Sequence, residues 1–198
     1  YTSLKTLANA TKIMCVWVQN TTGYVFFSGV PKSDGTSPML DSERGLWRST
    51  DNGTTWSRVL WVPVQNTIWG IDEDSDGDIY AGIYTVGSSY QNATIVKSTN
   101  NGTSWSSVYY NSTARHIHQV TVDKSNNYVY ATVGDNMLPW NIEYMIRSTN
   151  GGTTWTQIFG SLPQLVPVCV TPSARLLGTD DYSYGRIYRT TDDSSAAI

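Results

Sequence analysis

The stretch from Asp72 to Asp78 carries four aspartates at alternate positions around Gly77, a spacing that could bind a hard cation. Alternate carboxylates converge on one calcium ion when the chain turns at a glycine between them. The bidentate glutamate expected after that glycine is absent, because Ile83 stands in its place. A Ca²⁺ site and a solvated hairpin turn are therefore the two interpretations. The candidate metal ligands are Asp72, Asp74, Asp76 and Asp78.

Two histidines, His116 and His118, flank Ile117 at the spacing that places both side chains on one face of a strand. Paired imidazoles can bind a metal, but the sequence shows no evident third ligand. They can equally face a ligand together with Arg115, line a channel, or hydrogen-bond to each other. A metal site, a polar ligand site and a structural pair all stay open.

Aromatic rings form the third group with a chemical use, because exposed rings can stack on the faces of sugars. The candidates lie in or beside variable loops, at Tyr84, Tyr90, Trp140 and Tyr144. The same rings could cover the edge of a sheet or pack against a neighbouring molecule. Glycan contact and packing are therefore alternative interpretations.

A sequence repeat must position these groups. An eight-residue phrase starts at Ser49, Ser98 and Ser148, about fifty residues apart, and ends each time in tryptophan. A fourth copy, Thr190-Thr-Asp-Asp193, breaks off before its tryptophan. Repetition at such a period is typical of stacked supersecondary units.

Each letter of the phrase has a structural use. The Asp or Asn can accept hydrogen bonds from backbone N–H groups ahead of it and close a turn. The glycine supplies a positive φ, and the tryptophan places a large ring under the turn. The phrase therefore predicts a locked hairpin. Its residues are Asp51, Gly53, Trp56, Asn100, Gly102, Trp105, Asn150, Gly152, Trp155 and Asp192.

The phrase resembles the Asp-box, or BNR repeat, of the sialidase-like and sortilin-like β-propellers, whose pattern is S-x-D-x-G-x-T-W. The resemblance spans nearly the whole chain. It implies that each box joins the third and fourth strands of a blade at the outer rim, away from the ligand-binding face. What it implies for the box residues is a structural role.

Short β-rich runs and turns surround each box, and no stretch shows a helical period, so we expect an all-β protein. The fold class is a β-propeller of about four blades, each of four antiparallel strands. We expect one domain over 1–198, with blades near 11–62, 63–112, 113–162 and 163–198 plus 1–10. The last unit lacks a fourth strand, so the N-terminal strand is expected to complete it and close the ring.

Four blades is the lower limit of propeller size, whereas the Asp-box propellers that the chain resembles have six or more. Three explanations stay open: a compact four-bladed ring, a half-ring that pairs with another copy, or a fragment of a longer chain. The missing initiator Met at Tyr1 and the abrupt end at Ile198 favour processing or truncation.

The composition suits a protein outside the cell or on its surface, since only 15% of the 198 residues are charged and 12% are aromatic. A net charge of −3 without a basic stripe argues against nucleic acid as a partner. No apolar run reaches transmembrane length, which argues against membrane insertion. Acceptor sequons for N-glycosylation, some of which chance could supply, stand at Asn9, Asn20, Asn52, Asn92, Asn101 and Asn111.

The two cysteines, Cys15 and Cys169, fall in the first strands of their units. A disulfide between the first and last units is one interpretation. Because the two positions are out of register, two buried free thiols are favoured over a disulfide.

Resemblance to sialidases implies an arginine triad, a Tyr–Glu nucleophile pair and an acidic Asp, with the first arginine in an Arg-Ile-Pro motif. That motif is missing, and Arg186-Ile-Tyr188 is the nearest approach. The three glutamates, Glu43, Glu73 and Glu143, are not placed on first strands at the centre of a site. Catalysis is therefore less favoured than binding.

The expected function is an extracellular structural or interaction module that is glycosylated and associates with copies of itself, in a surface layer or filament. A carbohydrate-binding module with glycan partners is the first alternative. A sialidase-like glycoside hydrolase is the second.

Overall fold

The protein is built of four antiparallel sheets, as a computed structural model describes for residues 3–7, 10–31, 42–86, 92–134, 143–162, 165–171, 173–179 and 185–191. The first sheet contains β1 (Ala10–Val18), β2 (Val25–Pro31), β3 (Leu46–Ser49) and β4 (Ser57–Leu60). The second contains β5 (Asn66–Glu73), β6 (Ile79–Thr85), β7 (Ala93–Ser98) and β8 (Ser106–Asn111). The third contains β9 (His116–Asp123), β10 (Tyr128–Gly134), β11 (Glu143–Ser148) and β12 (Thr156–Leu162). The last contains β13 (Leu165–Thr171), β14 (Ala174–Thr179) and β15 (Ile187–Thr190).

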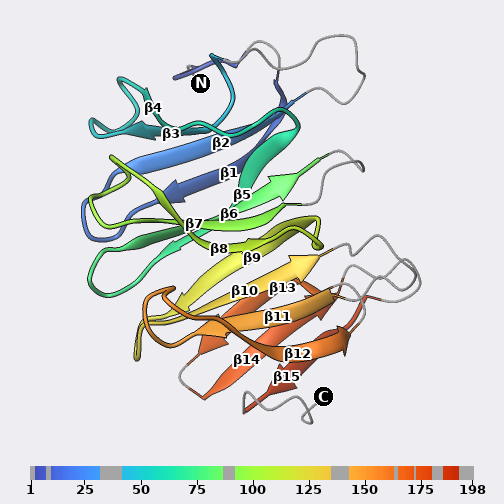
Figure 1. The fold of residues 1–198 in the computed structure, drawn as a ribbon. Coiled ribbons are helices and arrows are strands. Elements are labelled where there is room, and N and C mark those ends of the chain that lie inside the picture. The colour runs from blue at the N-terminus through green and yellow to red at the C-terminus, as the bar shows by residue number, and fades with distance from the viewer. Residues whose placement is uncertain are drawn as a thin grey trace.

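Each sheet is a meander, because its strands pair antiparallel in the order in which the chain makes them. The sheets follow one another down Figure 1, from β1–β4 at the top to β13–β15 at the bottom. The first strands of consecutive sheets are in contact, β1 with β5, β5 with β9 and β9 with β13. This is the arrangement of propeller blades with the first strand innermost, and it confirms the all-β prediction.

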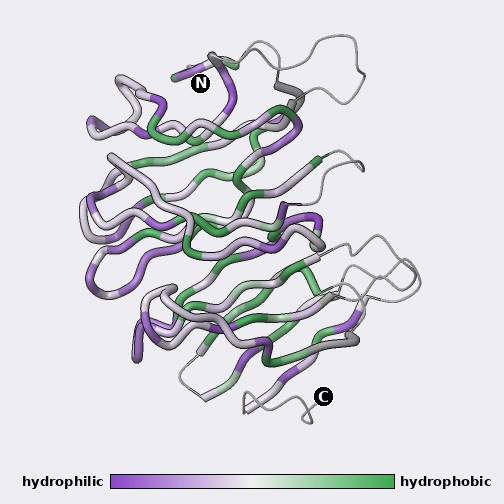
Figure 2. The backbone as a smooth tube through the Cα atoms, viewed as in Figure 1, coloured by the Kyte–Doolittle hydropathy of each residue, from purple (hydrophilic) through white to green (hydrophobic). Residues whose placement is uncertain are grey.

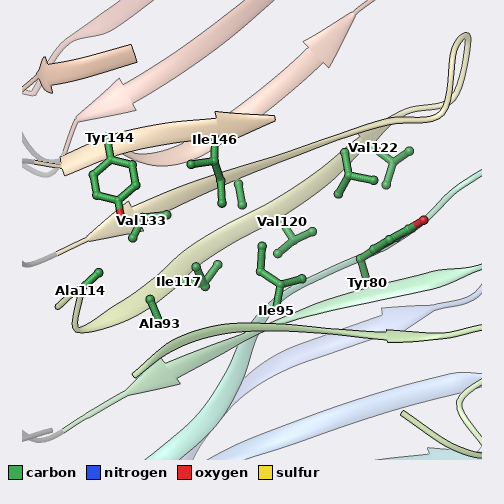
Figure 3. Close-up of a cluster of buried hydrophobic side chains, with 12 residues drawn as sticks. Tyr80, Ala93, Ile95, Ala114, Ile117, Val120, Val122, Val133, Tyr144 and Ile146 are labelled. Atoms are coloured by element: carbon green, nitrogen blue, oxygen red, sulfur yellow. The ribbon is translucent and has the colours of Figure 1, made fainter. Parts of the chain in front are cut away.

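The apolar core lies in the layers between sheets, where the strands are green in Figure 2. Figure 3 shows the layer between the second and third sheets, in which Ile95 and Ile117 are fully buried and Tyr80 packs at one end. Burying one such aliphatic side chain contributes about 1.5–3 kcal/mol. Packing between the sheets, in addition to hydrogen bonds within them, therefore holds the array together.

The N-terminal segment was expected to complete the last sheet. Among the described residues, Leu7 packs with Phe27 of the first sheet and the rings of Trp47 and Trp56. The Nζ of Lys5 also lies 4.4 Å from the centre of the Trp47 ring. In Figure 1 the described residues 3–7 lie beside the first sheet. The last sheet has three strands among the described residues, so its completion by residues 1–10 stays a prediction.

The three complete boxes form the expected locked turns between the third and fourth strands. Asp51 Oδ1 accepts a hydrogen bond from the Thr55 N–H, four residues ahead, at 2.8 Å. The Trp56 indole N–H donates to the Gly53 carbonyl at 2.9 Å. Positive φ angles of 55° at Asn52 and 87° at Gly53 suit a type I′ turn. Asn100 and Asn150 make the corresponding bonds in the next two boxes, and Asp192 lies outside the described residues.

The first serine of each box is a part of the lock that the sequence interpretation overlooked. The hydroxyl of Ser98 accepts the Gly102 N–H at 2.9 Å and lies 3.0 Å from Asn100 Oδ1, to which it donates. Ser49 and Ser148 make the same contacts. All three serines are buried, so each hydroxyl satisfies a backbone N–H that water does not reach.

The cysteines are both free thiols, and the prediction that both are buried is wrong for Cys169. Cys15 is buried in the layer between the first two sheets, and this burial raises the pKa of its thiol to about 12. Cys169 is exposed on β13, because the residues on its side of the last sheet have no further sheet packed against them among the described residues.

Candidate functional site

The candidate site lies along the innermost strands, where described residues line a smaller and a larger hollow. The smaller hollow, about 220 Å³, lies among β1, β5 and β9. Its lining residues are Met14, Cys15, Val16, Trp17, Trp69, Ile71 and Gln119. The larger, about 420 Å³, lies among β5, β9 and β13 and is lined in part by Asp72, Asp123 and Lys124.

Trp17 on β1 and Trp69 on β5, both half-buried, are among the residues that line the smaller hollow. The carboxamide of Gln119 supplies a polar group beside them, and its N–H donates to the Val120 carbonyl at 3.1 Å. Aromatic faces with a few fixed polar groups are typical of small-molecule and sugar sites. The sequence interpretation missed these three residues, although both tryptophans stand in first strands.

The histidine pair lies directly behind Trp69. The Nε2 atoms of His116 and His118 are 2.7 Å apart, and both side chains are buried. His116 Nδ1 lies 3.0 Å from the Thr85 carbonyl oxygen, which can only accept, so this nitrogen carries the proton. His116 Nε2 then accepts from the Nε2–H of His118, so the His116 ring is neutral.

Aromatic neighbours hold the pair in place. The Tyr84 ring stacks on His116 at 4.0 Å between centroids, and the Trp69 ring stacks on His118 at 5.8 Å. Trp69 also meets Tyr84 edge to face at 4.6 Å. On β10, the position beside His118 is Gly134, and a side chain there would clash with the imidazole. The histidines therefore support Trp69 from behind and do not present their nitrogens to solvent.

Burial governs the charge of this cluster. The pKa of His116 is lowered to about 2, first by burial and then by the neighbouring His118 and Arg115. Arg115 is half-buried, and its guanidinium donates to the Val86 carbonyl at 3.4 Å. Of the residues predicted to bind a ligand, the structure thus brings together Tyr84, His116 and His118, with Arg115 next to them in sequence. Trp140 and Tyr90 lie outside the described residues.

Tyr144 lies apart from this cluster, on β11, where its hydroxyl accepts a hydrogen bond from the Asn111 amide at 2.7 Å. It is also 3.2 Å from the hydroxyl of Tyr109. Burial raises the pKa of Tyr144. Its ring is buried between the second and third sheets, so it serves packing.

The aspartates of the acidic stretch make hydrogen bonds and an ion pair within the protein, and their carboxylates do not converge on one point. Asp72 accepts the Val122 N–H of the next sheet at 2.9 Å, and Asp74 accepts the N–H groups of Asp76 and Asp78 at 3.0 and 2.9 Å. Asp78 forms an ion pair with Lys97 at 2.7 Å. Over the part of the chain that the structure describes, no three His, Cys, Asp or Glu side chains gather closely enough to hold a metal ion. Calcium binding thus rests on the sequence spacing alone.

Glu73 is a further link between sheets, and it lies at the end of β5, the first strand of its sheet, where the sequence prediction did not place it. It is buried, and its carboxylate accepts the Asn20 N–H at 2.7 Å and the Thr21 hydroxyl at 3.0 Å. These donors belong to the β1–β2 turn, so the carboxylate holds the first sheet to the second. The side chain is therefore occupied structurally and is not arranged as a nucleophile.

The sequons differ in their exposure. Asn20, Asn52 and Asn92 are exposed, whereas Asn101 and Asn111 are half-buried. Asn101 Oδ1 accepts from Gln19 at 3.0 Å, and the Asn111 amide is bonded to Tyr144. Asn9 lies outside the described residues.

Comparison with known proteins bears on the fold. No family model matches the chain, and no curated protein matches its sequence. Among solved structures, it resembles the GH74 xyloglucanase of Xanthomonas campestris with a TM-score of 0.64 and 20% identity, covering 92% of this chain and 29% of that one. A Hadza microbial sialidase gives a TM-score of 0.62 and 13% identity over 96% of this chain and 46% of that one.

A chain of a nidogen/laminin complex also matches, with a TM-score of 0.55 and 12% identity over 86% of this chain and 73% of that one. At these identities the likeness establishes the β-propeller fold alone. The chain spans less than half the length of the xyloglucanase and of the sialidase. In addition, the described residues contain no helix that is both long and apolar enough to span a membrane.

Proposed function

We propose that this chain is a carbohydrate-binding β-propeller module whose ligand lies over the inner strands. The observation that carries the proposal is the hollow in which the indoles of Trp17 and Trp69 meet the Gln119 carboxamide. Indole rings stack on the apolar faces of sugars, and a carboxamide can both donate to and accept from sugar hydroxyls.

The dimensions of this hollow favour one unit of a glycan. Its volume of about 220 Å³ lies below the roughly 300 Å³ at which pockets for drug-sized ligands begin. A chain of sugars could continue along the inner strands toward the larger hollow, where Lys124 and Asp72 offer polar partners 3.6 Å from each other. The ligand class that fits is therefore a neutral or weakly charged oligosaccharide.

Binding without hydrolysis is favoured by the state of the nearby carboxylates. A glycosidase needs two carboxyl groups that face the scissile bond. Asp72 accepts from Val122 and Thr121, and Asp123 accepts from the Ser125 hydroxyl at 2.6 Å and the Ser125 N–H at 3.0 Å. Both carboxylates have structural partners, so a sialidase-like activity has less support than binding.

The similar structures support a glycan ligand more than a purely structural role, because a xyloglucanase and a sialidase are among them. An extracellular or cell-surface location fits this function, since glycans of that kind are presented there. We extend the proposal to N-glycosylation of the exposed Asn20, Asn52 and Asn92.

A glycan array tests the proposal, with xyloglucan fragments and sialosides among its ligands. We expect the wild-type chain to bind a defined set of oligosaccharides and Trp69→Ala to lose that binding. Trp61→Ala is the matched control, because Trp61 is exposed outside both hollows. A wild-type array without reproducible binding, or equal loss in both variants, would argue against this site.

A further inference from the structure

The two end sheets expose apolar residues at positions that are buried everywhere else in the chain. Ile187 on β15 pairs with Gly178 and has the same place in its sheet as Leu46, Ile95 and Met145. Those three side chains are fully buried under the following sheet, whereas Ile187 is 82% exposed. The last sheet therefore carries an interface residue that no described residue covers.

Leu176 on β14 repeats this relationship. Leu176 occupies the second-strand position that Phe26, Tyr80 and Tyr130 occupy in the other three sheets, and those three residues are fully buried. Leu176 is 37% exposed. We call the surface formed by Leu176, Ile187 and Arg189 the tail face.

The opposite end shows the complementary half. Val16 on β1 pairs with Phe27 and has the same place as Ile71, Val120 and Val168, all of which are buried under the preceding sheet. Val16 is 70% exposed, and Val18 beside it is also exposed. We call Val16, Val18 and the turn at Asn52 the head face.

A polar contact repeats along the array in the same way. Arg48 of the first sheet donates to the Asn101 carbonyl of the second box, and Lys97 donates to the Gly151 carbonyl of the third box at 3.2 Å. In register, Arg189 on the tail face corresponds to these two cations.

The acceptor that corresponds to the Asn101 and Gly151 carbonyls is the carbonyl of Asn52, on the exposed turn of the first box. Asp51 precedes it, and the Thr55 side chain and N–H lower the pKa of this carboxyl to about 2, so the head face carries a negative charge. A cation on the tail face thus meets an acceptor and a negative charge on the head face.

The N-terminal segment leaves the inner part of the head face open. Leu7 covers Phe27, and Leu4 lies against the box turn near Gly53. Neither covers the β1 residues Val16 and Val18, which remain exposed. The open part is therefore the strip nearest the innermost strand.

We infer that the tail face of one copy of this chain packs against the head face of another. The inner strip of each face is one half of a contact that the chain already makes three times between its own sheets, and a second copy brings the missing half in the same register. Leu4 lies at Gly53 as Phe26 lies at Gly102, so it has to leave the box turn to admit Leu176 of the second copy. A contact between two different faces closes into a ring or continues as a filament. Two copies would give eight sheets, which is within the range of known propellers.

Light scattering of the wild-type chain over a wide concentration range gives the first test. We expect particles of at least about twice the 22.0 kDa of one chain. Ile187→Asp on the tail face and Val16→Asp on the head face should each weaken association at least about tenfold, because a carboxylate would be buried against apolar side chains. Val64→Asp is the matched control, since Val64 is exposed but belongs to neither the head face nor the tail face.

Mixing the two variants identifies the pairing. Chains with Ile187→Asp keep an intact head face, and chains with Val16→Asp keep an intact tail face. The mixture should therefore form one-to-one pairs that neither variant forms alone. Circular dichroism spectra that match the wild type, together with cooperative thermal melting of each variant, show that the chains remain folded; the melting temperature itself should fall where association is lost.

Three results would overturn the inference. The first is a wild-type chain that stays monomeric at every concentration. The end faces would then not be covered by a second copy, and other blades of a longer protein could cover them instead. Association that survives Val16→Asp would indicate contact between like faces. Association lost equally with Val64→Asp would place the contact elsewhere.

Discussion

The Nε2 atoms of His116 and His118 lie 2.7 Å apart in a buried pair that cannot form when both rings are protonated. If both rings were protonated, two N–H groups and two positive charges would face each other. The pair therefore ties the stability of the inner strands to pH, and with it the position of the Trp69 ring that stacks on His118.

The first prediction concerns the pH dependence of unfolding. His116 stays neutral in the folded protein down to a pKa of about 2, whereas the unfolded chain takes up a proton below the ordinary value of 6.5. The stabilisation is fully present above pH 6.5 and is lost as the pH falls toward 2. Urea unfolding between pH 7.5 and 4.5 should show a loss of up to about 1.4 kcal/mol per pH unit from this group.

The control for that experiment is His116→Asn, whose amide can still donate to the Thr85 carbonyl but does not titrate. Its pH dependence should be flatter than that of the wild type. Parallel pH profiles for the two proteins would contradict a neutral buried His116.

The second prediction concerns the box serines. Ser98→Ala removes the acceptor of the buried Gly102 N–H, so it should destabilise the protein by about 1–3 kcal/mol in chemical unfolding. Ser106→Ala, an exposed serine on β8, should change the free energy of unfolding by no more than about 0.5 kcal/mol. Equal effects of the two substitutions would show that the hydroxyl of Ser98 is not part of the lock.

The boxes also show how far sequence reasoning reaches. The repeated Asp or Asn, Gly and Trp determine local turns, and local turns at a fixed spacing predicted the meander of each sheet. The buried serines were missed because a small hydroxyl residue is common at any turn. Their role depends on burial by the neighbouring sheet, which the phrase alone does not reveal.

Longer-range contacts were harder to predict. The segment near Leu7 matches a fourth strand in pattern, but the pattern does not say which sheet it joins, and Leu7 packs on the first. Trp17 and Trp69 were missed, because their place in one hollow depends on how consecutive sheets stack. His116 and His118 were predicted to share a face, and the structure shows that this face is covered by Tyr84 and Trp69.

The third prediction concerns metal. The carboxylate oxygens of Asp72 and Asp74 accept N–H groups, and Asp78 is paired with Lys97. Binding Ca²⁺ would require these bonds to break, so millimolar Ca²⁺ or EDTA should leave the melting temperature unchanged. A rise of several degrees with Ca²⁺ that Asp74→Asn abolishes would instead establish a calcium site in this stretch.

The fourth prediction concerns glycosylation. When the chain is secreted from a eukaryotic host, peptide mass spectra should show glycans at Asn20, Asn52 and Asn92, whose side chains are exposed. Asn101 and Asn111 should be poorly occupied, since their side chains are bonded to Gln19 and Tyr144. Glycans mainly at Asn101 and Asn111 would contradict the exposures described for these turns.

The central claim is that glycans bind at the hollow between Trp17 and Trp69, and fluorescence of these indoles tests it most directly. Titrating the wild-type chain with the best array ligand should give a saturable change in tryptophan emission. Trp69→Ala should abolish saturation, whereas Trp61→Ala should keep the wild-type dissociation constant. Unchanged affinity in Trp69→Ala would contradict the account and place the ligand elsewhere on the propeller.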